Sequence, residues 1–297
     1  MRSYRIVYVD AFTATPLTGN PCAVLTDARG LTDDEMQAIA AETNLSETAF
    51  VLPSERADFR ARYFTPRREL PFAGHPTIAT AFTLAEEGLV KLTGPVTPLR
   101  LELGVGVIPV EIHTRDGKTP DRVVMTQQKP VFGPTFTAAE TAPCFTLEVS
   151  DLMADPAPQV VSTGVPFLIV PARDVAALRK VQMRRDALGA LCARAGVNAA
   201  FMFCLGGYTG EADTAARLLD PQGTSEDPYT GSATGCLGAY VVAYGLTSGL
   251  HLVAEQGHPL GRPGCGELEI VGTPGDIQAV RLGGAAVRSM EGRVFLP

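Results

Sequence analysis

The chain has 297 residues, of which 45% are hydrophobic and 19% are charged, and its formal net charge is −7. No apolar run approaches the roughly 20 residues that a membrane-spanning helix needs, and an acidic chain offers no basic face to backbone phosphates. Residues 1–10 alternate like a strand and lack the pattern of a signal peptide. These features predict a cytoplasmic protein that binds neither membranes nor nucleic acid.

One amphipathic helix is predicted among the strand patterns of the first half. Residues 31–42 place Thr32 at a helix N-cap with Glu35 three residues later, which forms a capping box ahead of a face of apolar residues. Alternating or short apolar runs predict strands at residues 48–52, 59–64, 99–103, 107–113 and 122–126.

Several prolines follow Gln128, and proline removes backbone donors and disfavours helices. We therefore expect one domain over residues 1–128, joined by a last strand at about residues 286–297, and a second domain over residues 129–285. The second domain is predicted to contain a helix over residues 184–195. Its other apolar runs, and those at the end of the chain, predict strands at residues 159–171, 199–205, 213–219, 267–271, 277–283 and 288–295.

Two stretches of the chain resemble each other. Residues 69–89 align with residues 226–246 at a constant offset of 157, and Arg62 matches Arg217 at an offset of 155. Chance similarity among apolar strands and glycine turns could explain the short match, but not a register kept over the long one. The repeat therefore predicts two related domains.

Each copy contains a helix that is apolar almost all round, at residues 75–87 and 232–244. A helix without a polar face is buried, so we expect each one inside a shell of strands. Gly88 and Gly245 end these helices where a left-handed residue is favoured. Together these features predict an α+β fold of two pseudo-symmetric domains, each with strands around a central helix.

Each buried helix begins with a glycine followed by a polar residue, Gly74 with His75 and Gly231 with Ser232. Unpaired N–H groups and the positive end of the helix dipole favour a carboxylate or an oxyanion there, and glycine permits its close approach. Two such helix starts, if they face each other, predict a site for a small anion. The alternatives are a simple N-cap for Ser232 and a structural role for His75.

Two carboxylates are the candidate acid–base groups. Asp227 precedes Pro228, which keeps its backbone extended and allows its side chain to point toward the site. An exposed aspartate in a turn is the alternative. Glu47 stands at the start of the apolar strand at residues 48–52, and a carboxylate entering a buried strand suggests a functional reason.

The remaining patterns argue against bound metals and nucleotides. The six cysteines show no Cys-x-x-Cys pair and no metal-ligand spacing with the four histidines, so we expect reduced thiols without a disulfide framework. Gly104 and Gly106 lack the third glycine and the following helix of a dinucleotide-binding loop, and no P-loop pattern occurs. No metal and no cofactor are predicted.

Four motifs, in this order, resemble signatures of the PhzF-like family of phenazine-biosynthesis isomerases and epimerase-like proteins. They lie at residues 44–51, 64–77, 226–233 and 256–263, and the second is Phe-Thr-Pro-Arg-Arg-Glu-Leu-Pro-Phe-Ala-Gly-His-Pro-Thr. The resemblance implies the diaminopimelate epimerase fold, in which a mostly antiparallel, barrel-like sheet surrounds the central helix of each domain and the active site lies between the domains. It also implies a homodimer.

The resemblance further implies cofactor-free proton transfer on a small carboxylate substrate. Glu47 would be the general acid and base, in surroundings that desolvate it and raise its pKa. His75, Asp227 and Ser232 would shape the site and assist proton movement. The residues expected to hold the substrate are Gly74, Gly231, Thr230 and Tyr229, the last of which stands where the family usually has a small residue.

The residues at the two helix starts argue against a two-thiol racemase. Such an enzyme needs a cysteine at each helix start, and Ala73 and Thr230 occupy those positions. Two alternatives stay open. They are a one-base racemase or epimerase of an amino or hydroxy acid, acting through Glu47, and a non-catalytic protein that binds small carboxylates.

Overall fold

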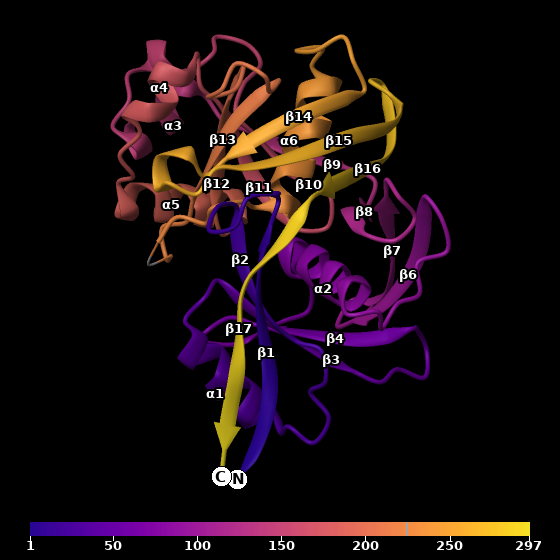
Figure 1. The fold of residues 1–297 in the computed structure, drawn as a ribbon. Helices are drawn as coiled ribbons and strands as arrows, with labels where there is room; N and C mark the ends of the chain where they lie inside the picture. Colours follow the sequence, from indigo (N-terminus) through magenta and orange to yellow (C-terminus); the bar gives the residue numbers. More distant parts are fainter. Residues whose placement is uncertain (224) are drawn as a thin grey trace. The chain divides into compact units, whose positions relative to one another are not determined.

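The computed structural model describes residues 1–223 and 225–297, and contacts between Cα atoms divide the chain into two units. Unit 1 comprises Met1–Met125 and Gly283–Pro297, and unit 2 comprises Thr126–Leu282. Figure 1 shows the path of the chain through them. Each unit combines many strands with few helices, so the predicted α+β class is confirmed.

The strands of unit 1 form one paired series. β1 (Arg2–Ala11) lies between β17 (Ala286–Leu296) and β2 (Asn20–Leu25) and is antiparallel to both. The series continues from β2 through β3 (Glu47–Leu52), β4 (Phe59–Phe64), β6 (Val96–Leu103), β7 (Gly106–Thr114) and β8 (Pro120–Gln127), and the short β5 (Glu69–Leu70) pairs with β4. The last two residues of β8 already belong to unit 2. The β2–β3 and β4–β6 pairs are parallel, because a helix connects the strands of each pair.

The helix α2 (Gly74–Glu86) is the centre of unit 1. It contacts β1, β2, β3, β7 and β17, and every residue from Gly74 to Ala85 is buried. Figure 1 shows these strands around it. Gly88 follows the helix with φ of 72°, and the Leu89 N–H donates to the Leu84 carbonyl at 2.9 Å, as in a Schellman cap. The predicted buried helix and its glycine stop are confirmed.

Unit 2 repeats this order of elements. Its paired strands follow one another as β9 (Val131–Thr135), β10 (Gln159–Ser162), β11 (Pro166–Pro171), β12 (Ala200–Leu205), β13 (Thr214–Leu219), β14 (His251–Gln256) and β15 (Gly264–Thr273), and β16 (Asp276–Gly284) comes next in the chain. The β11–β12 and β13–β14 pairs are parallel. Helices again connect them: α4 (Val175–Lys180) and α5 (Arg185–Ala195) in the first pair, α6 (Gly231–Ala243) in the second.

The helix α6 has the place in unit 2 that α2 has in unit 1. It contacts β10, β11, β12 and β15, and its buried residues run round all its sides. Gly245 follows it with φ of 64°, and the Leu246 N–H donates to the Val241 carbonyl at 2.9 Å. The Gly-Leu pair that ends both copies of the sequence repeat therefore makes the same helix stop in both units.

Local signals predicted some elements well and others not. The capping box of α1 (Asp33–Thr43) is present, with the Glu35 N–H donating to Thr32 Oγ1 at 3.2 Å and the Thr32 N–H to Glu35 Oε2 at 2.9 Å. The prediction of a single strand over residues 159–171 is wrong. This segment forms two antiparallel strands, β10 and β11, because Gly164 has φ of 135° and turns the chain.

The proline-rich stretch also holds more structure than its composition suggested. Besides β9 it contains α3 (Ala138–Thr141), with a second capping box between Thr137 and Glu140. Short 3₁₀ segments lie at Ala142–Phe145 and Val149–Asp151 there, and at His258–Leu260 further on. Their turns are too short to show a helical period in the sequence.

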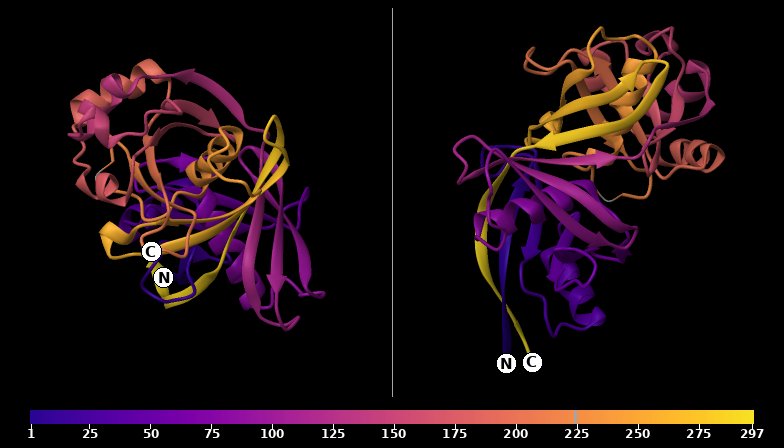
Figure 2. Two further views of the ribbon diagram at one scale, coloured as in Figure 1. Left: turned by 90° about the horizontal axis from the view of Figure 1, so that it is seen from above. Right: turned by 90° about the vertical axis from the view of Figure 1, so that its right-hand side faces the viewer.

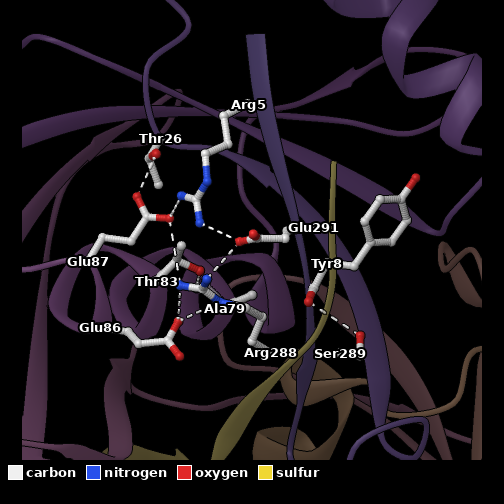
Figure 3. Close-up of polar contacts among 10 residues, drawn as sticks. All are labelled: Arg5, Tyr8, Thr26, Ala79, Thr83, Glu86, Glu87, Arg288, Ser289 and Glu291. Atoms are coloured by element: carbon white, nitrogen blue, oxygen red, sulfur yellow. Dashed lines mark hydrogen bonds and ion pairs between the residues drawn. The ribbon is translucent and has the colours of Figure 1, made fainter. Parts of the chain in front are cut away.

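A network of ion pairs lies at the C-terminal end of α2 (Figure 3). Glu86 and Glu87 place negative charge at the negative end of the helix dipole. Arg5 of β1 pairs with Glu87 and, at 2.7 Å, with Glu291 of β17. Arg288 of β17 pairs with Glu86 at 2.8 Å and with Glu291 at 2.9 Å. Two arginines thus offset the charge and join the helix end to the first and last strands.

The two chain ends lie side by side, as every view in Figures 1 and 2 shows, because Arg2 pairs with Leu296 in the β1–β17 ladder. Among the described residues, no helix combines the length and apolar character needed to cross a membrane. The cysteines are free thiols, with Cys265 exposed and the others buried.

Candidate active site

Unit 1 brings two of the predicted site residues together. Glu47 is the first residue of β3, and His75 is the second residue of α2. Glu47 Oε2 lies 3.3 Å from His75 Nε2, and the two side chains are 16% and 5% exposed. Gly74 begins the helix, and the N-cap residue Ala73 offers no side-chain hydrogen bond. First-turn N–H groups therefore lie next to a nearly buried carboxylate and imidazole.

The strand order of unit 1 explains this meeting. β2 and β3 are parallel neighbours, with Cys22 opposite Glu47, so the starts of both strands lie at the same edge near the start of α2. Asn20 begins β2, is fully buried, and places Nδ2 3.0 Å from His75 Nδ1. Asn20 was not among the predicted site residues, because an asparagine between Gly19 and Pro21 is typical of an ordinary turn.

His75 is neutral in this environment. Burial lowers its pKa from 6.5 to about 3, and the backbone carbonyl of Pro21 opposes part of that shift. A neutral imidazole has one N–H donor and one acceptor nitrogen. His75 can therefore exchange hydrogen bonds with its neighbours without carrying charge.

The lowered pKa of His75 predicts a pH-dependent stability. The unfolded chain binds a proton on this residue below about pH 6.5 and the folded chain only below about pH 3, so stability is lost progressively as the pH falls from about 6.5 toward 3. Between about pH 6.5 and 5, the free energy of unfolding of the wild type should fall by about 1.5 kcal/mol more than that of His75→Gln. Urea titrations at both pH values measure this. His251→Gln, at an exposed position, should behave as the wild type, and parallel losses in wild type and His75→Gln would contradict the shift.

In unit 2, Asp227 lies in the turn before α6 and is held by neighbours on both sides. The Thr230 hydroxyl donates to Asp227 Oδ2 at 2.6 Å. Gln256, 1% exposed at the end of β14, donates from Nε2 to the Asp227 carbonyl at 2.8 Å and accepts from the Thr230 N–H at 2.9 Å. Gln256 begins the fourth sequence motif, and no role was predicted for it. It braces the turn that carries Asp227.

The first turn of α6 is supported from inside unit 2. Gln127 Nε2 donates to the Gly231 carbonyl at 3.0 Å, and the Thr163 hydroxyl donates to Gln127 Oε1 at 2.5 Å. A Cβ at Gly235 would lie 1.8 Å from that Oε1, so any other residue there would displace the Gln127 amide. The N-cap residue is Thr230, which makes no side-chain cap, and Ser232 lies half-buried inside the helix. The simple N-cap interpretation of Ser232 is therefore wrong.

Tyr229 points into unit 2. It is fully buried, and its hydroxyl donates to the Ala254 carbonyl at 3.2 Å. Burial raises the pKa of the phenol, so it stays protonated. Gly264 packs against the ring, where a Cβ would come within 2.8 Å of Tyr229 Cδ2. The role of Tyr229 as a substrate contact stays a prediction.

An arginine–glutamate pair anchors the turn before each central helix. Arg62 of β4 contacts Glu69 through two hydrogen bonds of 2.7 Å. Arg217 of β13 contacts Glu226 through bonds of 3.0 and 2.8 Å. All four residues belong to the sequence repeat, which aligns Arg62 with Arg217 but did not predict a role for either. The same ion pair thus holds the chain ahead of the central helix in both copies of the repeat.

The arrangement offers groups suited to proton transfer near a bound anion. A carboxylate next to a neutral imidazole can accept or return a proton, and uncapped helix starts can bind negative charge. Among the described residues, no group of three or more histidines, cysteines, aspartates and glutamates could hold a metal ion.

Comparison with known proteins identifies the family. The phenazine biosynthesis-like protein family, PhzC-PhzF, matches residues 9–292. The chain belongs to this family. The predicted recognition is therefore confirmed over nearly the whole length of the protein.

Relatives of this PhzF-like chain are named isomerases. It is 34% identical over 297 residues to the trans-2,3-dihydro-3-hydroxyanthranilate isomerase of Pseudomonas aeruginosa, covering 99% of this chain and 100% of the relative. It is also 34% identical to an uncharacterized isomerase of Clostridium acetobutylicum, covering 97% of this chain and 96% of that protein. The PhzF-like chain is thus an enzyme of the isomerase class.

Solved structures confirm the fold. A PhzF-family phenazine biosynthesis protein of Bacillus anthracis matches with a TM-score of 0.89 and 31% identity over 100% of both chains. A hydroxyproline epimerase from Agrobacterium vitis matches with a TM-score of 0.67 and 13% identity over 99% of this chain and 92% of that one. At that identity the second likeness shows only that the PhzF-like chain shares the epimerase fold.

Proposed function

We propose that this PhzF-like protein moves a proton on a small carboxylate substrate by general acid–base catalysis, with Glu47 as the group that removes and returns the proton. The observation that supports this most is the contact of 3.3 Å between Glu47 and the buried His75. Proteins usually adapt a carboxylate for proton abstraction from carbon by shielding it from water. The proposed reaction uses neither metal nor cofactor.

The proposal assigns the remaining predicted residues to substrate binding. Gly74 and Gly231, with Thr230 and Tyr229, would hold the substrate. The absence of a side-chain cap on α2 and on α6 supports this, because uncapped first-turn N–H groups favour a carboxylate or an enolate-like oxygen. His75, Asp227 and Ser232 would shape the site and assist proton movement.

The relative from Pseudomonas aeruginosa suggests which substrates to test first. Its name specifies a dihydro-hydroxyanthranilate, which is a small ring acid with one carboxylate. We propose the same chemical class for this chain. An amino or hydroxy acid racemised by the same glutamate is the second candidate, favoured by the shared fold of the hydroxyproline epimerase.

The test is to incubate the purified protein in D₂O with small ring acids, including trans-2,3-dihydro-3-hydroxyanthranilate, and with a panel of amino and hydroxy acids. We expect an isomer of one ring acid, detected by NMR, with deuterium in the product to the extent that Glu47 exchanges its proton with solvent. Exchange at the α-carbon with loss of optical activity would favour the racemase. Binding without product or exchange throughout the panel would contradict an isomerase and favour a carboxylate-binding protein.

A further inference from the structure

A buried threonine lies one turn inside each central helix. Thr77 of α2 is fully buried, and Thr234 of α6 is 1% exposed. The two residues align at the offset of 157 that relates the copies of the sequence repeat. After the first glycine, they are the only identical residue in the two helices. The other helix positions differ in size or polarity, so burial alone does not account for a threonine at both places.

Both threonine hydroxyls make the same hydrogen bond. Thr77 Oγ1 donates to the Ala73 carbonyl at 2.7 Å, and Thr234 Oγ1 donates to the Thr230 carbonyl at 3.0 Å. Ala73 and Thr230 are the N-cap residues of α2 and α6. The Thr230 carbonyl also accepts from the Thr234 N–H at 2.9 Å. The hydroxyl therefore adds a second bond between the N-cap residue and the next turn of the helix.

In unit 1 this bond is connected to a neighbouring strand. Thr77 Oγ1 lies 3.1 Å from the hydroxyl of Tyr63 on β4, and Tyr63 is 1% exposed. A hydroxyl has one proton, and that of Thr77 is directed to the Ala73 carbonyl, so the phenol donates to Thr77. Burial raises the pKa of Tyr63, which keeps this donor protonated. Two hydrogen bonds in series therefore join the start of α2 to β4.

These threonines differ from an ordinary helix cap in their effect on the first-turn N–H groups. A serine or threonine at the N-cap accepts from an N–H two or three residues later, so it occupies a donor. Neither N-cap residue makes such a bond here, and the Thr230 hydroxyl donates to Asp227 instead. Thr77 and Thr234 donate to the N-cap carbonyl. They fix the first turn without occupying any of its N–H groups.

The direction of these N–H groups matters because they are few. Pro76 has no N–H, so only those of Gly74 and His75 precede Thr77 in α2. Hydrogen bonds weaken steeply when donor and acceptor are misaligned. A first turn that could tilt or fray would therefore lose much of its attraction for an anion.

We propose that Thr77 and Thr234 are positioning residues, whose hydroxyls hold the N-cap carbonyls of α2 and α6 and thereby aim the first-turn N–H groups at a carboxylate of the substrate. This inference rests on the proposed function, in which the two helix starts bind the substrate. Neither threonine contacts the substrate in this role. Each acts through the backbone of the first turn.

The test is to measure the binding of anthranilate, a small ring carboxylate, to the full-length protein by calorimetry. Thr77→Val and Thr234→Val keep the shape of the side chain and remove its hydroxyl. We expect each to raise the Kd by about tenfold, because part of a hydrogen bond to a charged group is lost. Thr77→Ser and Thr234→Ser keep the hydroxyl and should bind like the wild type. A wild type that does not bind anthranilate would overturn the inference.

The matched control is Thr83→Val, which removes the same kind of bond further along α2. Thr83 Oγ1 donates to the Ala79 carbonyl at 2.7 Å (Figure 3), and Thr83 is fully buried. We expect this variant and Thr77→Val to lower the midpoint of urea unfolding alike, but only Thr77→Val to weaken binding. Wild-type Kd in the folded valine variants at 77 and 234, or an equal rise in Thr83→Val, would overturn the inference. If Thr77→Val does not fold, Thr234→Val decides by the same criterion.

The inference and the proposed function can fail separately. Calorimetry with anthranilate needs no turnover, so it measures the effect of the threonines even if Glu47 moves no proton. With a substrate found in the D₂O screen, Thr77→Val and Thr234→Val should raise KM by about tenfold and change kcat by less than about threefold, as when ground-state binding is lost. An active isomerase with a normal KM in both variants would overturn the inference and leave the proposed function intact.

Discussion

Glu47→Gln is expected to lower isomerase turnover by about 10²- to 10⁴-fold, the usual contribution of a general acid–base group. The amide has nearly the shape of the carboxylate but cannot accept a proton from carbon. Because the amide fills nearly the same space, the surroundings of residue 47, including His75 Nε2 at 3.3 Å from Glu47 Oε2 in the wild type, should stay intact. The measurements are kcat on the substrate found in the D₂O screen and substrate affinity by calorimetry.

A matched control for this variant exists in the same unit. Glu111 lies 3.0 Å from His113 on β7, so Glu111→Gln alters a second glutamate–histidine pair to which no site role is assigned. We expect that variant to retain wild-type turnover and Glu47→Gln to retain wild-type affinity. Near-normal turnover in Glu47→Gln would remove this residue from the chemistry, and a matching loss in Glu111→Gln would point to a general effect of lost negative charge.

Arg217→Met is expected to cost about 3–5 kcal/mol of unfolding free energy, the usual effect of leaving a buried charge without its partner. Arg217 and Glu226 are each 13% exposed. Besides its two bonds to Glu226, Arg217 donates to the carbonyls of Leu178 and Val181 at 3.1 and 3.2 Å. Methionine fills much of the same volume but leaves all of these acceptors without the guanidinium. Urea unfolding measures the loss as a lower transition midpoint.

Two comparisons show whether the buried charge is the cause. The double variant Arg217→Met/Glu226→Leu removes both charges and should recover a large part of the lost stability. Arg62→Met breaks the equivalent pair in unit 1, where Glu69 is 42% exposed, so water can solvate the remaining carboxylate and the loss should be smaller. Equal losses at Arg62 and Arg217, or no recovery in the double variant, would contradict the explanation.

Much of the architecture follows from short-range patterns. The helices α2 and α6 are apolar on all sides, and each is followed by glycine and leucine, so both their burial and their ends could be predicted. The capping box placed the start of α1 within one residue. These predictions succeed because periodicity, capping and glycine conformations depend on neighbours within a few positions. The hairpin at Gly164 was missed because an apolar run does not reveal where a strand reverses.

The candidate site was predicted only in part, because local patterns do not record contacts between residues far apart in the sequence. Family motifs pointed to Glu47, His75, Asp227 and Ser232, and the structure adds side chains that contact His75 and the turn at Asp227. Asn20 meets His75 across 55 positions of sequence, and nothing near it in the chain indicates that partner. Gln256 likewise reaches the turn at Asp227 from 29 positions away. Such contacts depend on strand order.

The sequence by itself determined the class of the fold, the two central helices with their glycine stops, and the membership in a family of isomerases. Only the tertiary structure decided that Asn20 faces His75, that His75 faces Glu47, and that Gln256 holds the turn before α6. The physical reason is that side chains distant in sequence meet through the pairing of β2 with β3 and of β13 with β14. A parallel pair brings together residues separated by a whole helix, and no local pattern records that register.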